Sequence, residues 1–564
     1  MDHGIRTSRQ AEPGHLASAP EAIRVASHRR PRSGTSQPTN PPGRLRIPAV
    51  GQLFLILAVQ AVLSLRLIKA DTAFQDEALY LWAGHREIAH LLHGVPVPPF
   101  PTYFSGAPVI YPPFGALTDS IGGLSAARIL SLVFMLGATG LLWSTTRLLY
   151  GEIAAFFAAA LFAIGGPTLH LGSFATYDAM SVFLVALSAW CAVRASQLKA
   201  SQRPGGEPVE QEQHERGNAT GWMIAAGLAL AAANATAYSI TLFDPVVIGL
   251  AFVASVGRTS PRLALRRCLT LLIVLIAGVG LAVLIGGSYY RTGINNTTIQ
   301  RAPGPDSALT IFADSWFWTG SVAVIALIGV IIRLSRRPWT PANWLPLLAT
   351  AALLLVPTEQ ASLHTIASLN KHGTMGAWFA STAAGFAIDA FVAWSGAGRT
   401  RTMTIGACVV ALVLPAKVGI SQAQTFATEW PNSTSFTAIL GPLVNNSPGR
   451  VLVEDPSIAE YYLKAGTDWK RWSGTRNIVL PSGKSTGGPT QNAGVVGPGN
   501  AGVYAVFIQE GYFSLVALNF ADTTALDKAI RADLRHNRRY HIIDVVPYGP
   551  EHGTYVIWRY EPRR

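Results

Sequence analysis

The sequence predicts a polytopic α-helical membrane protein that carries an extracytoplasmic α/β domain at its C-terminal end. Three observations predict this fold class. Of the 564 residues, 49% are apolar and only 13% are charged, whereas soluble proteins carry about 25% charged residues. Eleven apolar runs follow one another between 47 and 420, most of them near the roughly 20 residues that span a bilayer. Residues 421–564 then change to alternating strand-like and helix-like segments.

The N-terminal segment differs from the rest of the chain in composition. Residues 1–46 are rich in Pro, Ser and Arg and lack apolar periodicity, so we expect a disordered basic cytoplasmic tail. The membrane domain is expected over 47–420 and begins with the run 47–68. The other ten runs lie at 124–147, 152–168, 177–194, 220–237, 239–256, 268–288, 315–333, 342–357, 373–395 and 402–420.

The distribution of basic residues predicts the topology. Alternate connections between the runs are basic, as the positive-inside rule requires of the cytoplasmic side. These connections carry Arg147; Arg194, Lys199 and Arg203; Arg258, Arg262, Arg266 and Arg267; Arg333, Arg336 and Arg337; and Arg399 and Arg401. We therefore expect a multi-pass plasma-membrane protein with a cytoplasmic N-terminus. An odd number of spans then places 421–564 outside.

Residues 421–564 are predicted to form a small α/β domain. Strand-like runs lie at 451–454, 477–480, 503–508, 541–546 and 554–559, and helical stretches at 457–464 and 524–536. The Gly-, Pro- and Ser-rich segment 482–500 is expected to be a loop. The aromatic residues Tyr461, Tyr462, Trp469 and Trp472 could stack on a sugar, although core packing or contact with the membrane surface is the more ordinary explanation.

The first outer loop, 69–123, carries the most informative motif. Asp76 and Glu77 stand just after the first span, where two adjacent carboxylates are costly unless they are solvated, paired or bound to a metal. The residues that follow show helical apolar spacing, which predicts an amphipathic helix in the membrane interface. Two interpretations are open from the residues alone: the acids cap this helix, or they carry chemistry.

A first span followed by an outer loop that begins Asp76-Glu77-Ala78-Leu79-Tyr80 resembles the GT-C superfamily of membrane glycosyltransferases. The chain is most similar to the dolichyl-phosphate-mannose-protein mannosyltransferase-like group, family 39, and its bacterial relatives. Its Arg-rich composition suggests an actinobacterial source. The resemblance implies a GT-C-like membrane domain and a polyprenyl-phosphate-linked sugar donor. It also implies that Asp76 is the general base of an inverting transfer, with Glu77 orienting Asp76 or joining a metal site.

Further candidate residues lie on the same predicted side of the membrane. Asp178 stands at the outer start of a span and is expected to contact substrate or metal, or to cap the helix. Lys371 and His372 are candidates for the donor phosphate, with Lys371 as a snorkelling anchor in the alternative. Tyr290 and Arg291 are second candidates. Some members of the resembled family use a divalent metal ion and others do not, so its presence stays open, with Glu77 and His90 as candidate ligands.

The expected function is that of an inverting polyprenyl-phosphate-sugar-dependent glycosyltransferase, mannosyltransferase-like, in the cell envelope. Its expected partners are the lipid-linked donor, membrane lipid, and a glycan, protein or lipid acceptor. The alternatives are a transporter or flippase of an envelope precursor, and a scaffold that displays the C-terminal domain. No nucleic-acid partner is expected, because topology and anionic lipid account for the basic tail. The Gly483-Lys484-Ser485 triplet lacks the earlier glycine of a phosphate-binding loop.

Overall fold

A computed structural model provides the structure. It describes residues 49–198, 210–301, 303–336, 339–463, 468–475, 478–479, 485–486, 501–521, 523–549 and 553–562. The predicted tail, 1–46, lies outside the described residues, and so does most of the predicted loop 482–500.

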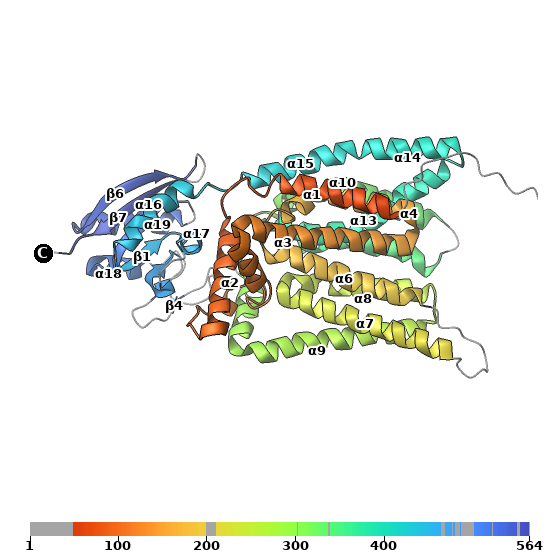
Figure 1. Cartoon of the computed structure of the whole chain (residues 1–564), viewed down its shortest axis with the longest axis horizontal. Helices are drawn as coiled ribbons and strands as arrows, with labels where there is room; N and C mark the ends of the chain where they lie inside the picture. Colours follow the sequence, from red (N-terminus) through yellow and green to blue (C-terminus); the bar gives the residue numbers. More distant parts are fainter. Residues whose placement is uncertain are drawn as a thin grey trace, which may run out of the picture. The chain divides into compact units, whose positions relative to one another are not determined.

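Most of the described chain up to residue 427 is helical (Figure 1). The helices are α1 (Ala49–Leu65), α2 (Gln75–His93), α3 (Tyr111–Tyr150), α4 (Glu152–Ala163), α5 (Gly166–Leu171), α6 (Tyr177–Gln197), α7 (Glu210–Thr236), α8 (Asp244–Val256), α9 (Pro261–Ile294), α10 (Ala308–Ser335), α11 (Trp344–Ala351), α12 (Leu355–Ser362), α13 (Leu369–Trp394), α14 (Arg399–Ala411) and α15 (Val413–Ala427). Short helical turns lie at Phe100–Thr102, Tyr238–Phe243, Asn295–Ile299, Pro341–Asn343 and Ala352–Leu354.

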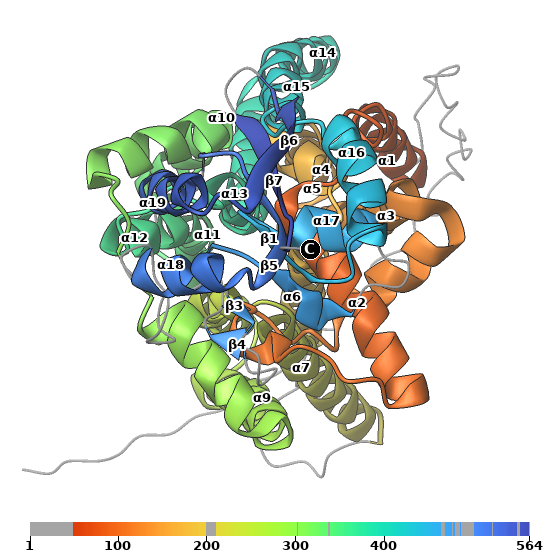
Figure 2. The ribbon, with the colours of Figure 1, turned by 90° about the vertical axis from the view of Figure 1, so that its left-hand side faces the viewer.

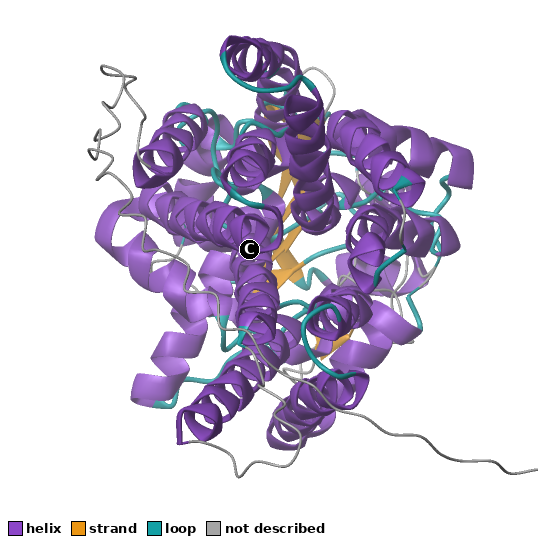
Figure 3. Cartoon of the chain, turned by 90° about the vertical axis from the view of Figure 1, so that its right-hand side faces the viewer, coloured by secondary structure: helices purple, strands orange, loops and turns teal. Residues whose placement is uncertain are grey.

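The expectation of a polytopic helical membrane protein is confirmed. Within the described ranges, nine helical segments are long and apolar enough to cross a membrane. Two shorter apolar helices, α1 and α4, occupy the other two expected runs. Figure 1 shows the long helices lying side by side, and Figure 3 shows the bundle from the end remote from the sheet. Helix α13 is the most enclosed of the nine, with 83% of its apolar window buried.

The loop after α1 holds two helical parts rather than one. Helix α2 runs across the direction of the spans (Figure 1), as expected of an interfacial helix. The second part is the first stretch of α3, which extends from Tyr111 to a kink at Gly122 and Gly123, where φ of Gly123 is +64°. Helix α2 packs tightly on this stretch, because a Cβ at Gly84 would lie 1.9 Å from the carbonyl oxygen of Pro112. The two parts therefore pack closely on each other, and α2 lies at the end of the bundle next to the sheet domain (Figure 1).

The C-terminal part forms a small α/β domain, as predicted. Its strands are β1 (Arg450–Val453), β2 (Trp472–Ser473), β5 (Phe513–Leu518), β6 (Tyr540–Pro547) and β7 (Thr554–Tyr560), with a separate pair β3 (Ile478–Val479) and β4 (Ser485–Thr486). Its helices are α16 (Thr434–Asn445), α17 (Ser457–Tyr462), α18 (Ala501–Glu510) and α19 (Thr524–His536), with a short turn at Trp469–Arg471. The five-stranded sheet has the order β2-β1-β5-β7-β6, in which β1 is parallel to β2 and β5 and the other pairs are antiparallel.

The two faces of this sheet are covered by different helices. Helices α16 and α17 pack on one face, and α18 and α19 pack on the other (Figure 2). The predicted strand at 503–508 is wrong, because this segment lies within α18. Tyr504 and Ile508 are four residues apart and both fully buried against the sheet, so tertiary packing overrides the β propensity of the segment. The strand β5, which was not predicted from the sequence, lies five residues further on.

Hydrogen bonds join the C-terminal domain to the loop after α1. The Tyr462 hydroxyl accepts a hydrogen bond from the backbone N–H of Ala73 (2.8 Å). The Tyr461 hydroxyl donates to Asp119 (2.7 Å), which also lies 2.6 Å from His85 on α2. Two of the aromatic residues considered for sugar stacking therefore attach the domain to this loop, and Trp472 is buried in the domain core.

Candidate functional site

Three helices that are distant in sequence begin at the same place. Asp76 stands in the first turn of α2, Asp178 in the first turn of α6, and Lys371 with His372 in the first turn of α13. The positive end of each helix dipole stabilises carboxylates at this position and disfavours the Lys371 ammonium. The two carboxylates compensate for that cost, so the charges depend on one another.

Lys371 is the centre of this cluster. Its Nζ donates a hydrogen bond to Oδ2 of Asp76 (2.6 Å) and lies 3.9 Å from Oδ2 of Asp178. Nζ also lies 5.8 Å from the centre of the Phe174 ring. The Lys371 side chain is 6% exposed, Asp178 is 1% exposed and Asp76 is 29% exposed. Asp76 is therefore the carboxylate that an incoming molecule can reach, whereas Asp178 holds Lys371 from the protein side.

Asp178 is held by its own neighbours. Thr176 donates its hydroxyl to Oδ2 (2.9 Å), and Nε2 of His372 lies 3.6 Å from Oδ1. Among the described residues, Oδ1 of Asp178 has no hydrogen-bond partner although it is buried. The structure thus brings together four of the residues predicted from the sequence: Asp76, Asp178, Lys371 and His372.

Tyr80 and Tyr177 lie beside the two carboxylates. Their ring centres are 4.7 Å apart. Burial, followed by the charges of Tyr177, Asp76 and Asp178, holds the pKa of Tyr80 well above its usual range. The Tyr80 hydroxyl consequently stays protonated and can donate a hydrogen bond within the cluster. No role was predicted from the sequence for either tyrosine.

Glu77 occupies a separate, fully enclosed position. It forms a bidentate ion pair with Arg128 of α3, with distances of 2.8 Å to Nε and 2.6 Å to Nη2. The backbone N–H groups of Phe74 (3.0 Å) and Ala175 (2.7 Å) also donate to the carboxylate. Arg128 in turn donates to the carbonyl oxygens of Ile68, Asp71 and Thr72. Glu77 therefore ties the segments before α2 and α6 together, and its carboxylate oxygens face these donors.

Arg128 was not predicted as a functional residue, although a signal was present. It is a single arginine near the start of the apolar run 124–147, and a charged residue inside a span is rare unless it is paired. Its partner could have been sought among the two acids at the start of the loop.

The remaining predicted residues lie elsewhere. Glu77 and His90 are thirteen residues apart on α2, which corresponds to about 20 Å along a helix, so they cannot share one metal ion. His90 is exposed, and its Nδ1 lies 2.9 Å from the carbonyl oxygen of Val95. Tyr290 and Arg291 lie near the end of α9. Arg291 is exposed there, and its Nε donates a hydrogen bond to the Gly287 carbonyl oxygen (3.4 Å).

The residues at the cluster fit a lysine-based site better than a protein-bound metal site. Among the described residues, no three His, Cys, Asp or Glu side chains are grouped as ligands for one ion. Asp76 and Asp178 both lie near the Lys371 ammonium, at 2.6 Å and 3.9 Å from its Nζ. The positive charge at this position thus comes from the chain itself.

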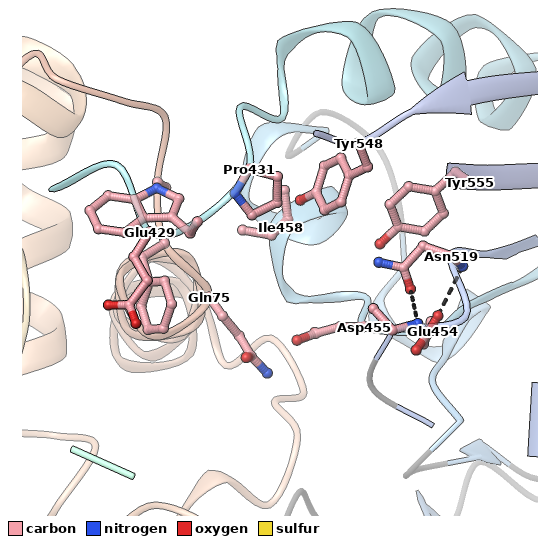
Figure 4. A pocket seen from close by; sticks show the side chains of 13 residues that line it. Gln75, Glu429, Pro431, Glu454, Asp455, Ile458, Asn519, Tyr548 and Tyr555 are labelled. Carbon is pink, nitrogen blue, oxygen red and sulfur yellow. Dashed lines mark hydrogen bonds between the residues drawn. The ribbon is translucent and has the colours of Figure 1, made fainter. Parts of the chain in front are cut away.

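A cleft opens next to this cluster, between the start of α2, the segment after α15, and the sheet domain (Figure 4). It has a volume of about 320 Å³. Gln75, the neighbour of Asp76, lines one wall, and Trp430 and Glu429 come from the segment after α15. The opposite wall lies at the carboxyl ends of β1 and β5, with Asp455 and Tyr555. After β1 the chain continues to β2 on one side of this strand pair, and after β5 it continues to β6 and β7 on the other side. Sheets of α/β domains commonly bind ligands at such a point.

Comparisons with known proteins agree with this architecture. The family model described as dolichyl-phosphate-mannose-protein mannosyltransferase matches residues 114–204. ArnT from Cupriavidus metallidurans, in a crystal structure bound to undecaprenyl phosphate, superimposes with a TM-score of 0.56 at 15% identity. The match covers 90% of this chain and 98% of ArnT. The chain has the GT-C fold.

Two archaeal structures support the GT-C fold of this chain. The oligosaccharyltransferase AglB from Archaeoglobus fulgidus, in complex with an inhibitory peptide and a dolichol-phosphate, gives a TM-score of 0.53 at 11% identity. That match covers 89% of this chain and 74% of AglB. An oligosaccharyltransferase from the same organism, in complex with Zn and sulfate, gives a TM-score of 0.52 at 13% identity, and the match covers 89% of this chain and 72% of that chain. No curated protein matches the chain.

Proposed function

We propose that the protein is an inverting membrane glycosyltransferase. It transfers a sugar from a polyprenyl-phosphate-linked donor to an acceptor hydroxyl at the outer face of the plasma membrane. The observation that carries this proposal is the buried Lys371 ammonium, bonded to the partly exposed Asp76 and backed by Asp178. One base and one cation at a shared position are what such a transfer requires. The proposal is supported by the GT-C fold and by the structures of ArnT with undecaprenyl phosphate and of AglB with a dolichol-phosphate.

Donor binding would rearrange the ion pair. The lipid tail of the donor stays in the bilayer, so its phosphate lies at headgroup depth, near the starts of α2, α6 and α13. The phosphate competes with Asp76 for Lys371, because charge-assisted bonds of an ammonium to either anion are similar in kind. Asp178, which also lies 3.6 Å from Nε2 of His372, holds Lys371 from the protein side during this exchange. Asp76 is then released from the ammonium, and its carboxylate is available to accept a proton.

The chemical step follows from these positions. Asp76 takes the proton of the acceptor hydroxyl as its oxygen forms a bond to the anomeric carbon of the donor sugar. The bond from that carbon to the phosphate oxygen breaks, and its electron pair leaves with the polyprenyl phosphate. Lys371 neutralises the charge that develops on this phosphate. A single displacement by the acceptor inverts the anomeric carbon.

The acceptor is proposed to enter through the cleft. Its described lining contains no Lys, Arg or His side chain but includes Glu429, Glu454 and Asp455, so it disfavours an anionic ligand such as the donor phosphate. Tyr548 and Tyr555 line it, but the Tyr555 ring stacks on Phe436 with ring centres 3.9 Å apart, so its hydroxyl rather than its ring face is offered to a ligand. Tyr555 is 3% exposed, and its hydroxyl points toward the cleft (Figure 4) without a hydrogen-bond partner among the described residues. These features favour an uncharged glycan over an anionic acceptor.

The test is to incubate the purified protein with a panel of polyprenyl-phosphate sugars, starting with mannose because of the family model, and neutral oligosaccharide acceptors. The expected result is release of polyprenyl phosphate together with a glycosylated product. A Tyr555→Phe variant should raise KM for the acceptor and leave acceptor-independent hydrolysis of the donor unchanged. Movement of a lipid-linked sugar across liposome membranes without any covalent product would instead favour the transporter or flippase.

A further inference from the structure

A second hollow lies between α7 and α9, far from the Asp76 cluster. It has a volume of about 600 Å³ and is lined by the N-terminal part of α9 and by Ala219, Thr220 and Met223 of α7. The other end of α7 reaches the loop before α3, where the N–H of Ala107 donates to the carbonyl oxygen of Ala235. Residues 219 and 235 are about 24 Å apart along a helix. The hollow, which we call the α7–α9 groove, therefore lies at the opposite end of the bundle.

Three arginines line the α7–α9 groove. Arg262 and Arg266 are exposed and one turn apart, so they lie on the same face of α9. Arg267 is only 6% exposed, and its Nη2 donates to the carbonyl oxygen of Leu198 (3.0 Å). Its Nη1 is buried and has no hydrogen-bond partner among the described residues. The described lining of the groove includes no acidic residue, so three positive charges lie together without a described counter-ion.

A buried guanidinium without an anion is costly, and the surroundings indicate an anion with phosphate character. The groove lies at the N-terminus of α9, whose dipole favours negative charge. Ser260 caps this end by accepting the N–H of Leu263 (3.4 Å). Guanidinium groups bind phosphate oxygens in a bidentate manner. Together, the arginines and the helix end provide a site for one phosphate group.

The apolar part of the groove argues for a lipid rather than a free anion. Leu269 and Ile273 line it and are exposed, at 44% and 64%. They follow Arg266 along α9 by about 5 Å and 10 Å, which is the direction from headgroup depth toward the membrane interior. Deeper still, α7 and α9 close against each other, because a Cβ at Gly278 would lie 2.7 Å from Cβ of Ala231. The groove thus has a polar entrance, an apolar wall and a closed end.

We propose that the α7–α9 groove binds an anionic phospholipid, whose phosphate pairs with Arg262, Arg266 and Arg267 and whose acyl chain lies along Leu269 and Ile273. Basic pockets between membrane helices on the cytoplasmic side are known to bind such headgroups. This site is independent of the proposed transfer reaction. The lipid supplies the counter-ion for Arg267 and fills the space between two spans, so it stabilises the bundle.

The experiment measures the melting temperature of the delipidated protein in detergent as phosphatidylglycerol, phosphatidylcholine, glycerol phosphate or inorganic phosphate is added. We expect phosphatidylglycerol alone to raise it, with saturation at one lipid per chain by native mass spectrometry. The double variant Arg262→Gln/Arg266→Gln should weaken this binding at least about tenfold, a loss of about 1.4 kcal/mol. The double variant Arg399→Gln/Arg401→Gln is the matched control, since both residues are exposed at the start of α14, and it should bind like the natural protein.

Three outcomes would overturn the proposal. Equal stabilisation by inorganic phosphate would show a site for a soluble anion. Equal stabilisation by phosphatidylcholine would show nonspecific solvation by lipid. An undiminished response of the Arg262→Gln/Arg266→Gln variant would show that anionic lipid acts elsewhere on the protein. A third variant, Arg267→Met, should melt higher than the natural protein without lipid and lose the response to phosphatidylglycerol.

Discussion

The Glu77–Arg128 ion pair allows a prediction whose magnitude follows from the structure. In Arg128→Met, the buried Glu77 carboxylate keeps the N–H groups of Phe74 and Ala175 but loses its only cationic partner among the described residues. In Glu77→Gln, the buried guanidinium keeps three carbonyl acceptors and loses its anion. Removal of one partner from a buried ion pair costs about 3–5 kcal/mol, so each single variant should lose about this much stability.

The double variant Glu77→Gln/Arg128→Met is the informative one. It leaves no buried charge, and the amide oxygen of the glutamine can still accept from the backbone N–H groups. We therefore expect it to be more stable than the sum of the single changes predicts, by about 2 kcal/mol or more. The assay is denaturant unfolding in mixed micelles, followed by tryptophan fluorescence. Additive losses would refute the ion-pair account, and a Glu77→Gln protein of natural stability without activity would indicate that Glu77 takes part in the chemistry.

Three further predictions concern charge at the site and at the domain contact. Lys371→Met should lower kcat about 10²- to 10³-fold and weaken the binding of polyprenyl phosphate. Lys371→Arg should restore part of this binding. Equal turnover by Lys371→Met and the natural protein would contradict this prediction. Because Lys371 supplies the positive charge, turnover in EDTA should equal turnover with Mg²⁺ or Mn²⁺, and a loss in EDTA that added metal reverses would contradict this. Glu460 lies on α17, and burial, followed by the charge of Asp455, holds the pKa of its carboxyl well above its usual 4.5. The contribution of this group to stability is therefore full below about pH 4.5 and is lost as pH rises through the raised pKa. Melting curves of Glu460→Gln should lack this decline.

Several features of the fold could be predicted because they depend on local chemistry. The apolar runs match the helices, since a residue facing lipid must be apolar wherever it lies in the chain. The helix after Asp76 was predicted from its own periodicity. Segment 503–508 was wrongly predicted as a strand, because its β-prone residues form a helix that depends on packing against the sheet. The helical stretch before Gly122 was also missed, because its burial is set by contact with α2.

The candidate site was predictable in composition but not in arrangement. Asp76, Glu77, Asp178 and Lys371 were singled out as charges on the predicted outer side that the topology rule does not explain. Their direct contact could not be predicted from the sequence, because it results from three helices beginning at one point. The different roles of Asp76 and Glu77 also needed the structure: adjacent residues on a helix point about 100° apart, so one faces Lys371 and the other faces Arg128.

The central claim, that Asp76 is the base of a lipid-linked glycosyl transfer, is tested most directly by single-turnover kinetics of Asp76→Asn with a saturating donor. The asparagine keeps the shape and the contact with Lys371 but cannot accept the proton. We predict a rate at least about 10³-fold below that of the natural protein, with polyprenyl phosphate bound more tightly, because it no longer competes with a carboxylate for Lys371. An Asp76→Asn protein that transfers sugar at the natural rate would contradict the claim.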